Sequence, residues 1–271
     1  MKLITSKIIV ELQKSAITNV FDKTSFENLS AVILDSVNKM HASIPANKRI
    51  SYGIVHTIKE LGQFLSEIYC NHNAGLFKIS SGLYNNSVSM ESKAVALNML
   101  TISGLSDPIS ALPYFEKAAA DENWELREIS QILFRRLIKK NQETIQTFLL
   151  RLVKSEDPNV RRFVGETLRP VCENKWLYKQ PEYSLSIIKH LFSESKLYPR
   201  TSVGNNLSDL SRHQPGLIYQ TVEKLVASGD KNSYWIAYRA CRNLVKKEPE
   251  KVMKLLQTET YKYKDRIHSL E

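Results

Sequence analysis

The feature that most constrains the fold is a recurring unit in which a polar turn precedes an amphipathic helix. Four turns rich in Asp, Asn or Ser each introduce a segment with helical periodicity in the second half of the chain. Side chains of these types accept hydrogen bonds from the free amides of a first helical turn. The turns are 121–123, 155–159, 193–196 and 228–232. Gly and Pro are sparse and fall mostly between these segments, so the pattern predicts helices joined by short connections.

The predicted helices repeat along the chain. Glu128, Arg162 and Thr201 hold equivalent positions in segments that align by eye, 34 and then 39 residues apart. Second helices with apolar residues three and four apart are predicted between them, at 143–153, 184–192 and 215–226. An amphipathic helix cannot bury its apolar face alone, so neighbours stack to form the core. A period of about 40 residues with paired helices is typical of HEAT solenoids, and it predicts an all-α, HEAT-like superhelix.

The N-terminal part of the chain shows helical periodicity without a clear match to this repeat. Helices are predicted there at 4–20, 26–40, 54–69 and 91–102. We therefore expect residues 1–104 to form an N-terminal helical cap of the same solenoid. Residues 105–271 are expected to carry the HEAT-like repeats and the ligand groove.

The charge balance favours a polyanionic partner. The chain has 38 Lys and Arg against 28 Asp and Glu, a formal net charge of +10. Each phosphate neutralised by a protein cation releases condensed counterions, so a basic concave groove would suit nucleic acid. Charge alone is also compatible with an anionic membrane surface, or with a basic protein that binds neither.

Other functional classes lack their sequence signals. No apolar run approaches the roughly 20 residues that span a bilayer, and Lys7, Glu11 and Lys14 make the N-terminus an amphipathic helix instead of a signal peptide. The three cysteines and six histidines show no disulfide framework or metal-ligand spacing. Glycine-rich phosphate loops are missing. We expect a cytoplasmic protein, nucleoid-associated if prokaryotic, with no metal and no cofactor.

Aromatic and charged residues fall at one phase of the repeat. Trp124 precedes Glu128 by four residues, and Arg162 precedes Glu166 by four, so each pair shares a helix face. Asn205 is equivalent to Glu166 one repeat later. An ordinary ion pair between Arg162 and Glu166, and a solvent-facing Glu128, are the competing structural interpretations.

Three further residues have expected structural roles. Gly165 and Gly204 would allow another backbone, either a helix or a nucleic-acid strand, to approach closely. Trp235 is expected in the core of the last repeat.

Three segments resemble the AlkC branch of the AlkC/AlkD family of DNA-alkylation-repair glycosylases. The resemblance covers roughly residues 105–256 and is most specific in the middle third of the chain. It is carried by 157–170 with Trp176 shortly after, by 200–215 and by 240–247. One departure is that Arg200 stands alone in Tyr198-Pro199-Arg200-Thr201, where the family pattern has paired arginines.

The resemblance implies an enzyme that grips duplex DNA in a HEAT-like groove and cleaves the N-glycosidic bond of alkylated, cationic bases. Unlike most glycosylases, such an enzyme needs no base-flipping pocket. The resemblance assigns Trp124 and Glu128 to a Trp-x-x-x-Asp/Glu element beside the deoxyribose, Glu166 to a second carboxylate and Trp176 to a following aromatic. Both carboxylates, Glu128 and Glu166, would stabilise an oxocarbenium ion and orient the attacking water. The aromatic rings suit a sugar and a cationic base.

The implied DNA contacts are cations and one amide along the groove. Arginines suit phosphates because their planar donors match phosphate oxygens. These contacts are Arg161 or Arg162, Arg200, Asn205, and Lys246 with Lys247 at one end.

Three functions remain open on the sequence. The first is a monofunctional, monomeric DNA glycosylase acting on bases such as 3-methyladenine or 3-methylcytosine in duplex DNA. The second is a catalytically inactive HEAT-repeat protein that binds DNA of unusual structure. The third is a protein-interaction scaffold that uses the groove for a helix or peptide.

Overall fold

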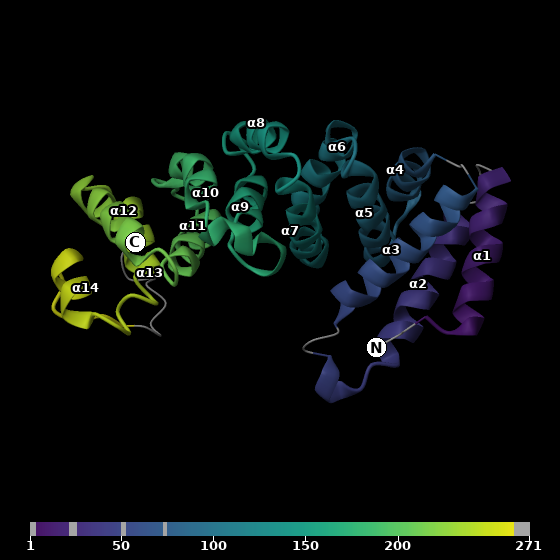
Figure 1. Cartoon of the computed structure of the whole chain (residues 1–271), viewed down its shortest axis with the longest axis horizontal. Coiled ribbons are helices and arrows are strands. Elements are labelled where there is room, and N and C mark those ends of the chain that lie inside the picture. Colours follow the sequence, from purple (N-terminus) through teal and green to yellow (C-terminus); the bar gives the residue numbers. More distant parts are fainter. Residues whose placement is uncertain (1–3, 22–25, 50–52, 73–74, 263–271) are drawn as a thin grey trace. The chain divides into compact units, whose positions relative to one another are not determined.

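The computed structural model describes residues 4–21, 26–49, 53–72 and 75–262, and every regular element in them is helical (Figure 1). The predicted all-α architecture is therefore confirmed. The chain forms two compact units, Met1–Asn141 and Gln142–Glu271. No helix in the described ranges is long and apolar enough to cross a membrane.

In the first unit, α5 lies at the centre of the helical packing. It contacts α2, α3, α4, α6 and α7, and four consecutive side chains, Ala94, Val95, Ala96 and Leu97, are fully buried. A helix surrounded by other helices buries all of its faces, which explains its apolar sequence. The helices of this unit are α1 (Ser6–Phe21), α2 (Phe26–Ala42), α3 (Ile54–Asn71), α4 (Leu76–Asn86), α5 (Met90–Gly104), α6 (Pro108–Ala119) and α7 (Trp124–Ile138). A short 3-10 turn, η1, spans Ala46–Lys48.

The four helices predicted in the N-terminal part are present as α1, α2, α3 and α5, with ends shifted by at most two residues. Two others, α4 and α6, were not predicted. The first has the sequence LFKISSGLYNN, and Ser, Gly and Asn are weak helix formers. The second contains Pro113. Packing against α5 stabilises both helices and offsets the low helix propensity of their sequences.

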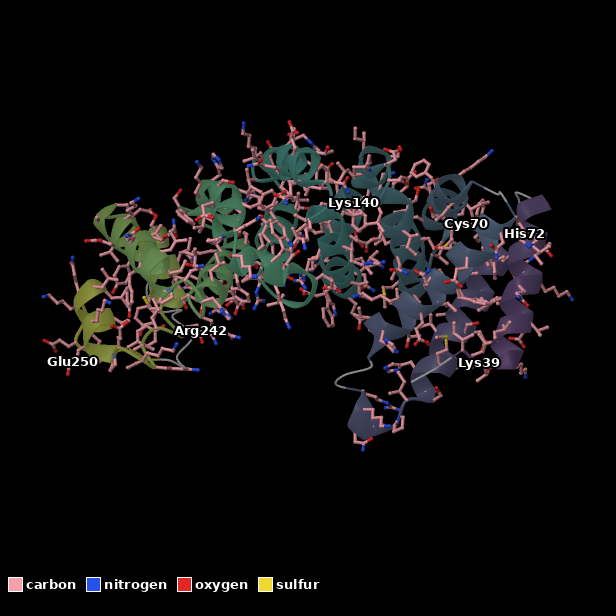
Figure 2. All side chains as sticks on the ribbon, in the orientation of Figure 1. Lys39, Cys70, His72, Lys140, Arg242 and Glu250 are labelled. Carbon is pink, nitrogen blue, oxygen red and sulfur yellow. The ribbon has the colours of Figure 1, made fainter. Side chains whose placement is uncertain are left out.

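The second unit stacks helices in two layers (Figure 1). One row is α9, α11 and α13, in which each helix packs on the next. The other contains α8, which contacts α9 and α10, and α12, which packs on α11 and α13. Side chains fill the space between the layers (Figure 2). The helices are α8 (Gln142–Leu152), α9 (Pro158–Thr167), α10 (Pro181–Ile188), α11 (Leu197–Leu210), α12 (Pro215–Ala227), α13 (Lys231–Ala240) and α14 (Pro249–Leu255). The 3-10 segments are η2 (Cys172–Tyr178) and η3 (Lys189–Leu191).

The predicted repeat phase is confirmed. Glu128, Arg162 and Thr201 are each the fifth residue of their helix, in α7, α9 and α11. The same position in α13 is Trp235, which is buried with 5% of its surface exposed, as expected of a core residue. Within the second unit, Arg162, Thr201 and Trp235 therefore lie on successive helices of one row, α9, α11 and α13.

Three of the four predicted polar turns supply a side-chain cap. Asn123 accepts a hydrogen bond from the amide of Glu125 at 2.8 Å, and Asp157 accepts one from Asn159 at 2.8 Å. Asp230 caps α13 in the same way, from the amide of Ser233 at 2.7 Å. At the start of α11 the cap position is Lys196, without a side-chain bond. A basic groove in residues 105–271, and a division at residue 104, stay predictions.

Candidate functional site

Trp124 and Glu128 lie on α7 of the first unit. Trp124 begins the helix and is 62% exposed, unusual for a large aromatic side chain. Glu128 is half-buried, and its Oε2 accepts a hydrogen bond from Nε2 of the buried Gln131. The i,i+4 spacing puts the exposed indole and this carboxylate on one side of the helix.

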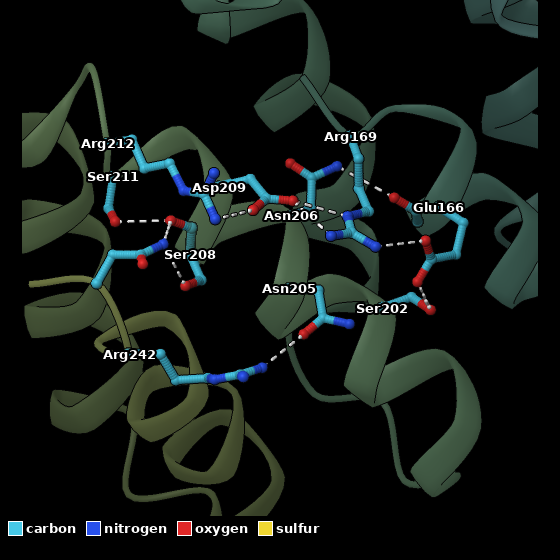
Figure 3. Close-up of polar contacts among 12 residues, drawn as sticks. Glu166, Arg169, Ser202, Asn205, Asn206, Ser208, Asp209, Ser211, Arg212 and Arg242 are labelled. Carbon is cyan, nitrogen blue, oxygen red and sulfur yellow. Dashed lines mark hydrogen bonds and ion pairs between the residues drawn. The ribbon is translucent and has the colours of Figure 1, made fainter. Parts of the chain in front are cut away.

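The other predicted site residues belong to the second unit, and the carboxylate among them is Glu166. It lies near the end of α9 with 5% of its surface exposed. Oε1 accepts a hydrogen bond from Ser202 Oγ at 2.8 Å, and Oε2 accepts one from Arg169 NH1 at 2.9 Å (Figure 3). Arg162 NH2 lies 4.0 Å from Oε1, so the predicted Arg162–Glu166 ion pair is present at the limit of ion-pair distance.

Glu166 is ionised in this environment. Burial opposes its negative charge, but the charges of Arg169 and Arg162 and the hydrogen bonds from Arg169 and Ser202 outweigh burial. The pKa of Glu166 therefore lies below its ordinary value. Such a carboxylate is an anion at neutral pH and is unsuited to act as a general acid.

Arg169 connects Glu166 to the next repeat, a link that the sequence did not predict. Its Nε donates to Asp209 Oδ2 on α11 at 2.8 Å, and its NH2 lies 2.7 Å from the same oxygen in an ion pair. Asp209 is itself buried, and Oδ1 lies 3.5 Å from NH2 of Arg212 (Figure 3). The three-residue spacing of Glu166 and Arg169 could have indicated their ion pair from the sequence. No sequence signal indicated that Arg169 also contacts Asp209, 40 residues away.

Both glycines mark close approaches of neighbouring helices. A Cβ on Gly165 would lie 3.0 Å from Ser202 Cβ, so α11 packs directly against α9 there. A Cβ on Gly204 would lie 2.9 Å from the Arg239 side chain. The predicted close approach is confirmed for a helix at Gly165, whereas at Gly204 a side chain uses the space.

Arg161 is engaged by its own protein. Nε and NH2 donate to the two carboxylate oxygens of Glu194 at 2.6 and 3.1 Å. NH1 donates to the carbonyl oxygens of Ser155 and Glu156 at 2.7 and 3.0 Å. This geometry favours a structural role. Arg162, by contrast, lies over the ring of Tyr198 at 4.2 Å.

Arg200, the third predicted phosphate contact, is buried. Its NH1 donates to Asn232 Oδ1, and its guanidinium lies 4.8 Å from the centre of the Trp235 ring. Asn205 Oδ1 accepts from Arg239 Nε at 2.9 Å and from Arg242 NH1 at 3.4 Å. Lys246 and Lys247 follow α13 and are exposed.

Trp176 lies in η2, a 3-10 segment interrupted by a non-helical residue at Asn174. Its ring packs on Tyr183 of α10, with 5.4 Å between the ring centres. Its indole Nε1 is enclosed without a hydrogen-bond partner in the described part of the chain. The aromatic rings that contact arginines near Glu166 and Asn205 are instead Tyr198 and Trp235. The role of Trp176 beside a base stays a prediction.

Metal-ligating side chains are dispersed. Across residues 4–21, 26–49, 53–72 and 75–262, no three His, Cys, Asp or Glu side chains are grouped to hold a metal ion.

Comparisons with known proteins identify relatives of this chain. A family model described as DNA alkylation repair enzyme matches residues 39–256, a range that contains every predicted site residue. The uncharacterized protein YhaZ of Bacillus subtilis (strain 168) is 28% identical over 146 residues. That match covers 52% of this chain but only 40% of YhaZ, less than half of the relative's length.

One solved structure shares the fold. It is the Pseudomonas fluorescens alkylpurine DNA glycosylase AlkC, bound to DNA containing an abasic site analog. The TM-score is 0.62 at 16% sequence identity, over 93% of this chain and 68% of AlkC.

Proposed function

Because this chain belongs to the family of DNA alkylation repair enzymes, we propose that it is a monofunctional DNA glycosylase. Its substrates are N-alkylated, cationic bases such as 3-methyladenine or 3-methylcytosine in duplex DNA. Its reaction is hydrolysis of the N-glycosidic bond. The observation that carries the proposal is the buried carboxylate of Glu166, kept ionised by Arg162 and Arg169.

The chemistry of a cationic base matches such a site. The C1′–N bond breaks with its electron pair going to the base, which leaves neutral and needs no proton from a general acid. Positive charge then develops on the sugar. A fixed carboxylate stabilises that charge without reorganising during the reaction. Glu166 is already ordered by two hydrogen-bond donors, Arg169 and Ser202, and by the charge of Arg162 4.0 Å away, which meets this requirement.

Glu128 is the more accessible of the two carboxylates and is assigned to the attacking water. It orients the water toward C1′ and accepts the proton that the water loses, so that the products are free base and an abasic sugar. Trp124, one helical turn earlier and 62% exposed, offers an apolar edge to the sugar and an electron-rich face to the cationic base.

The proposed partner is duplex DNA, bound by a monomer. The net charge of +10 supports this partner, and AlkC is a DNA-bound protein with the same fold. Arg162, Lys246 and Lys247 are assigned to the phosphates. Arg161 has all its donor nitrogens bonded within the protein, and Arg200 is buried with NH1 bonded to Asn232, so we propose that both act by fixing the geometry between repeats.

The direct test is release of methylated base from duplex DNA treated with a methylating agent, measured by chromatography under single-turnover conditions. Wild type is expected to release 3-methyladenine or 3-methylcytosine. Glu128→Gln and Glu166→Gln are each expected to lower the rate by about 100-fold or more, the usual effect of losing one preorganised electrostatic group.

The matched control is Glu125→Gln. Glu125 lies on the same helix as Glu128 and is exposed, so the same change of charge there is expected to leave the rate unaltered. A wild type that releases no base while a known glycosylase does, or a Glu128→Gln rate equal to that of Glu125→Gln, would contradict the assignment.

A second function, DNA binding without base release, is favoured by one observation. Both oxygens of Glu166 already accept hydrogen bonds from the protein, which is also what a purely structural carboxylate shows. This function predicts salt-dependent binding of duplex DNA, no base release, and no change in DNA affinity when Glu128 is replaced by Gln.

A further inference from the structure

Arg239 is a partly exposed arginine that the second unit holds in a fixed place. Its side chain occupies the space that the missing Cβ of Gly204 leaves open. The guanidinium lies 5.5 Å from the centre of the Trp235 ring, and Nε donates to Asn205 Oδ1 at 2.9 Å. Fixing a long side chain costs conformational entropy, so this arrangement is favoured only where the packing is specific.

A second arginine converges on the same acceptor. Arg242 NH1 donates to Asn205 Oδ1 at 3.4 Å (Figure 3), so one neutral amide oxygen receives bonds from two cations. Arg239, Arg242 and Asn205 are all partly exposed, and therefore a ligand can reach them.

In the described part of the chain, no neighbouring carboxylate balances the positive charge of Arg239. No carboxylate lies within ion-pair distance of it in the described part of the chain. Glu166, whose negative charge acts on Arg239, is itself ion-paired with Arg169. Burial and the neighbouring charge of Arg242 lower the pKa of Arg239, yet an arginine stays protonated at physiological pH. An anion bound between the two guanidinium groups would offset their mutual repulsion.

We propose that Arg239 and Arg242 form a binding site for one phosphodiester of a DNA backbone, with Asn205 as the residue that positions both guanidinium groups. The planar donors of two arginines match the oxygens of a phosphate. The inference rests on the proposed DNA partner but is independent of base excision. It also changes the role of Asn205 from a direct DNA contact to a support for two contacts.

The test is the salt dependence of binding to an undamaged duplex and to a matched duplex with an abasic site analog, measured by fluorescence anisotropy. Losing one phosphate contact is expected to make the slope of log K against log salt shallower by about 0.9. Arg239→Gln is expected to show this change and to weaken binding to both duplexes by the same factor. The control is Lys189→Gln, an exposed cation on η3, which is expected to keep the wild-type slope.

Asn205→Asp is the sharper variant because it changes almost no volume. The new carboxylate would accept bonds from both arginines and neutralise the site, so the slope should become shallower while the thermal melting temperature stays the same or rises. If Arg239→Gln and Asn205→Asp are both folded and both keep the wild-type slope, the phosphate site is overturned and the proposed DNA partner is not affected. A wild type that binds neither duplex at low salt overturns both this site and the proposed DNA partner. If the slopes change as expected but the wild type releases no base, only the proposed glycosylase activity is contradicted.

Discussion

Arg127 and Arg161, 34 residues apart, make the same pair of hydrogen bonds in successive repeats. NH1 of Arg127 donates to the carbonyl oxygens of Asp121 and Glu122 at 2.7 and 3.0 Å. NH1 of Arg161 donates to those of Ser155 and Glu156 at 2.7 and 3.0 Å. Each arginine is the fourth residue of its helix and bonds carbonyl groups of the turn before it. This arginine is a structural element of the repeat.

Replacing Arg161 with Ala is expected to lower the free energy of unfolding by about 3 kcal/mol, because it removes the ion-pair partner of the buried Glu194 carboxylate and leaves it the amide of Lys196. Urea denaturation measures the change. Lys189→Ala, an exposed cation, is the control and is expected to cost less than about 0.5 kcal/mol. Equal stability of the two variants would mean that Arg161 is not part of the structural framework.

The stability that Glu166 provides is expected to depend on pH. The folded state holds the pKa of Glu166 below its ordinary 4.5, so the ionised carboxylate stabilises the fold fully above pH 4.5. The contribution is lost as the pH falls through the folded-state pKa. The stability difference between wild type and Glu166→Gln should therefore be largest near neutral pH and shrink in acid. Denaturation curves from pH 3 to 7 test this. A difference that grows on acidification would have the wrong sign.

Gly165→Ala is expected to destabilise the protein by about 1–3 kcal/mol, because the added methyl group would meet Ser202 at 3.0 Å and push α11 from α9. Gly216→Ala is the matched control in α12. Nothing lies within 4 Å of its added Cβ, and it is expected to stabilise by about 0.5 kcal/mol. Thermal melting of the two variants decides whether the close approach at Gly165 matters.

Trp124→Ala is expected to separate stability from activity. Because the indole is 62% exposed, the stability should change by no more than about 0.5 kcal/mol. Base release should fall by about tenfold, the loss of one ring–cation contact. Calorimetry and the release assay measure the two effects. If release is unchanged, Trp124 does not contact the substrate.

Trp176→Phe removes the enclosed Nε1 donor but keeps an aromatic ring against Tyr183. Because the lost donor has no acceptor, stability is expected to stay within about 1 kcal/mol of wild type. Base release should be unchanged if Trp176 serves packing alone. A rate as low as that of Trp124→Ala would instead support the role beside the base that the family resemblance implies.

Most of the helices, their phase and most of their caps were predictable because these depend on residues close together in the chain. Asn123, Asp157 and Asp230 cap from within their own turns. The Arg162–Glu166 pair was likewise visible as an i,i+4 spacing. Local periodicity carries this information without reference to tertiary contacts.

The partners of the site residues were not predictable, because they come from the next repeat. Asp209 meets Arg169 across 40 residues, and Glu194 takes the donors of Arg161 from 33 residues away. The position of Trp176 was also not predictable, because the short 3-10 segment that carries it is interrupted at Asn174 and lacks the 3.6-residue period of an α-helix.

The contacts of Arg161 with Glu194 and of Arg200 with Asn232 each tie the start of one helix to the turn that opens the next. The repeats that begin with α9 and α11 therefore depend on the next repeat for their hydrogen bonding. Deleting α13 would leave NH1 of Arg200 without its acceptor, and deleting α11 with its turn would leave Nε and NH2 of Arg161 without theirs. We expect this unit to melt as a single cooperative block instead of fraying from its C-terminal end, so that amide protons across α9, α11 and α13 report one common free energy of opening in hydrogen exchange.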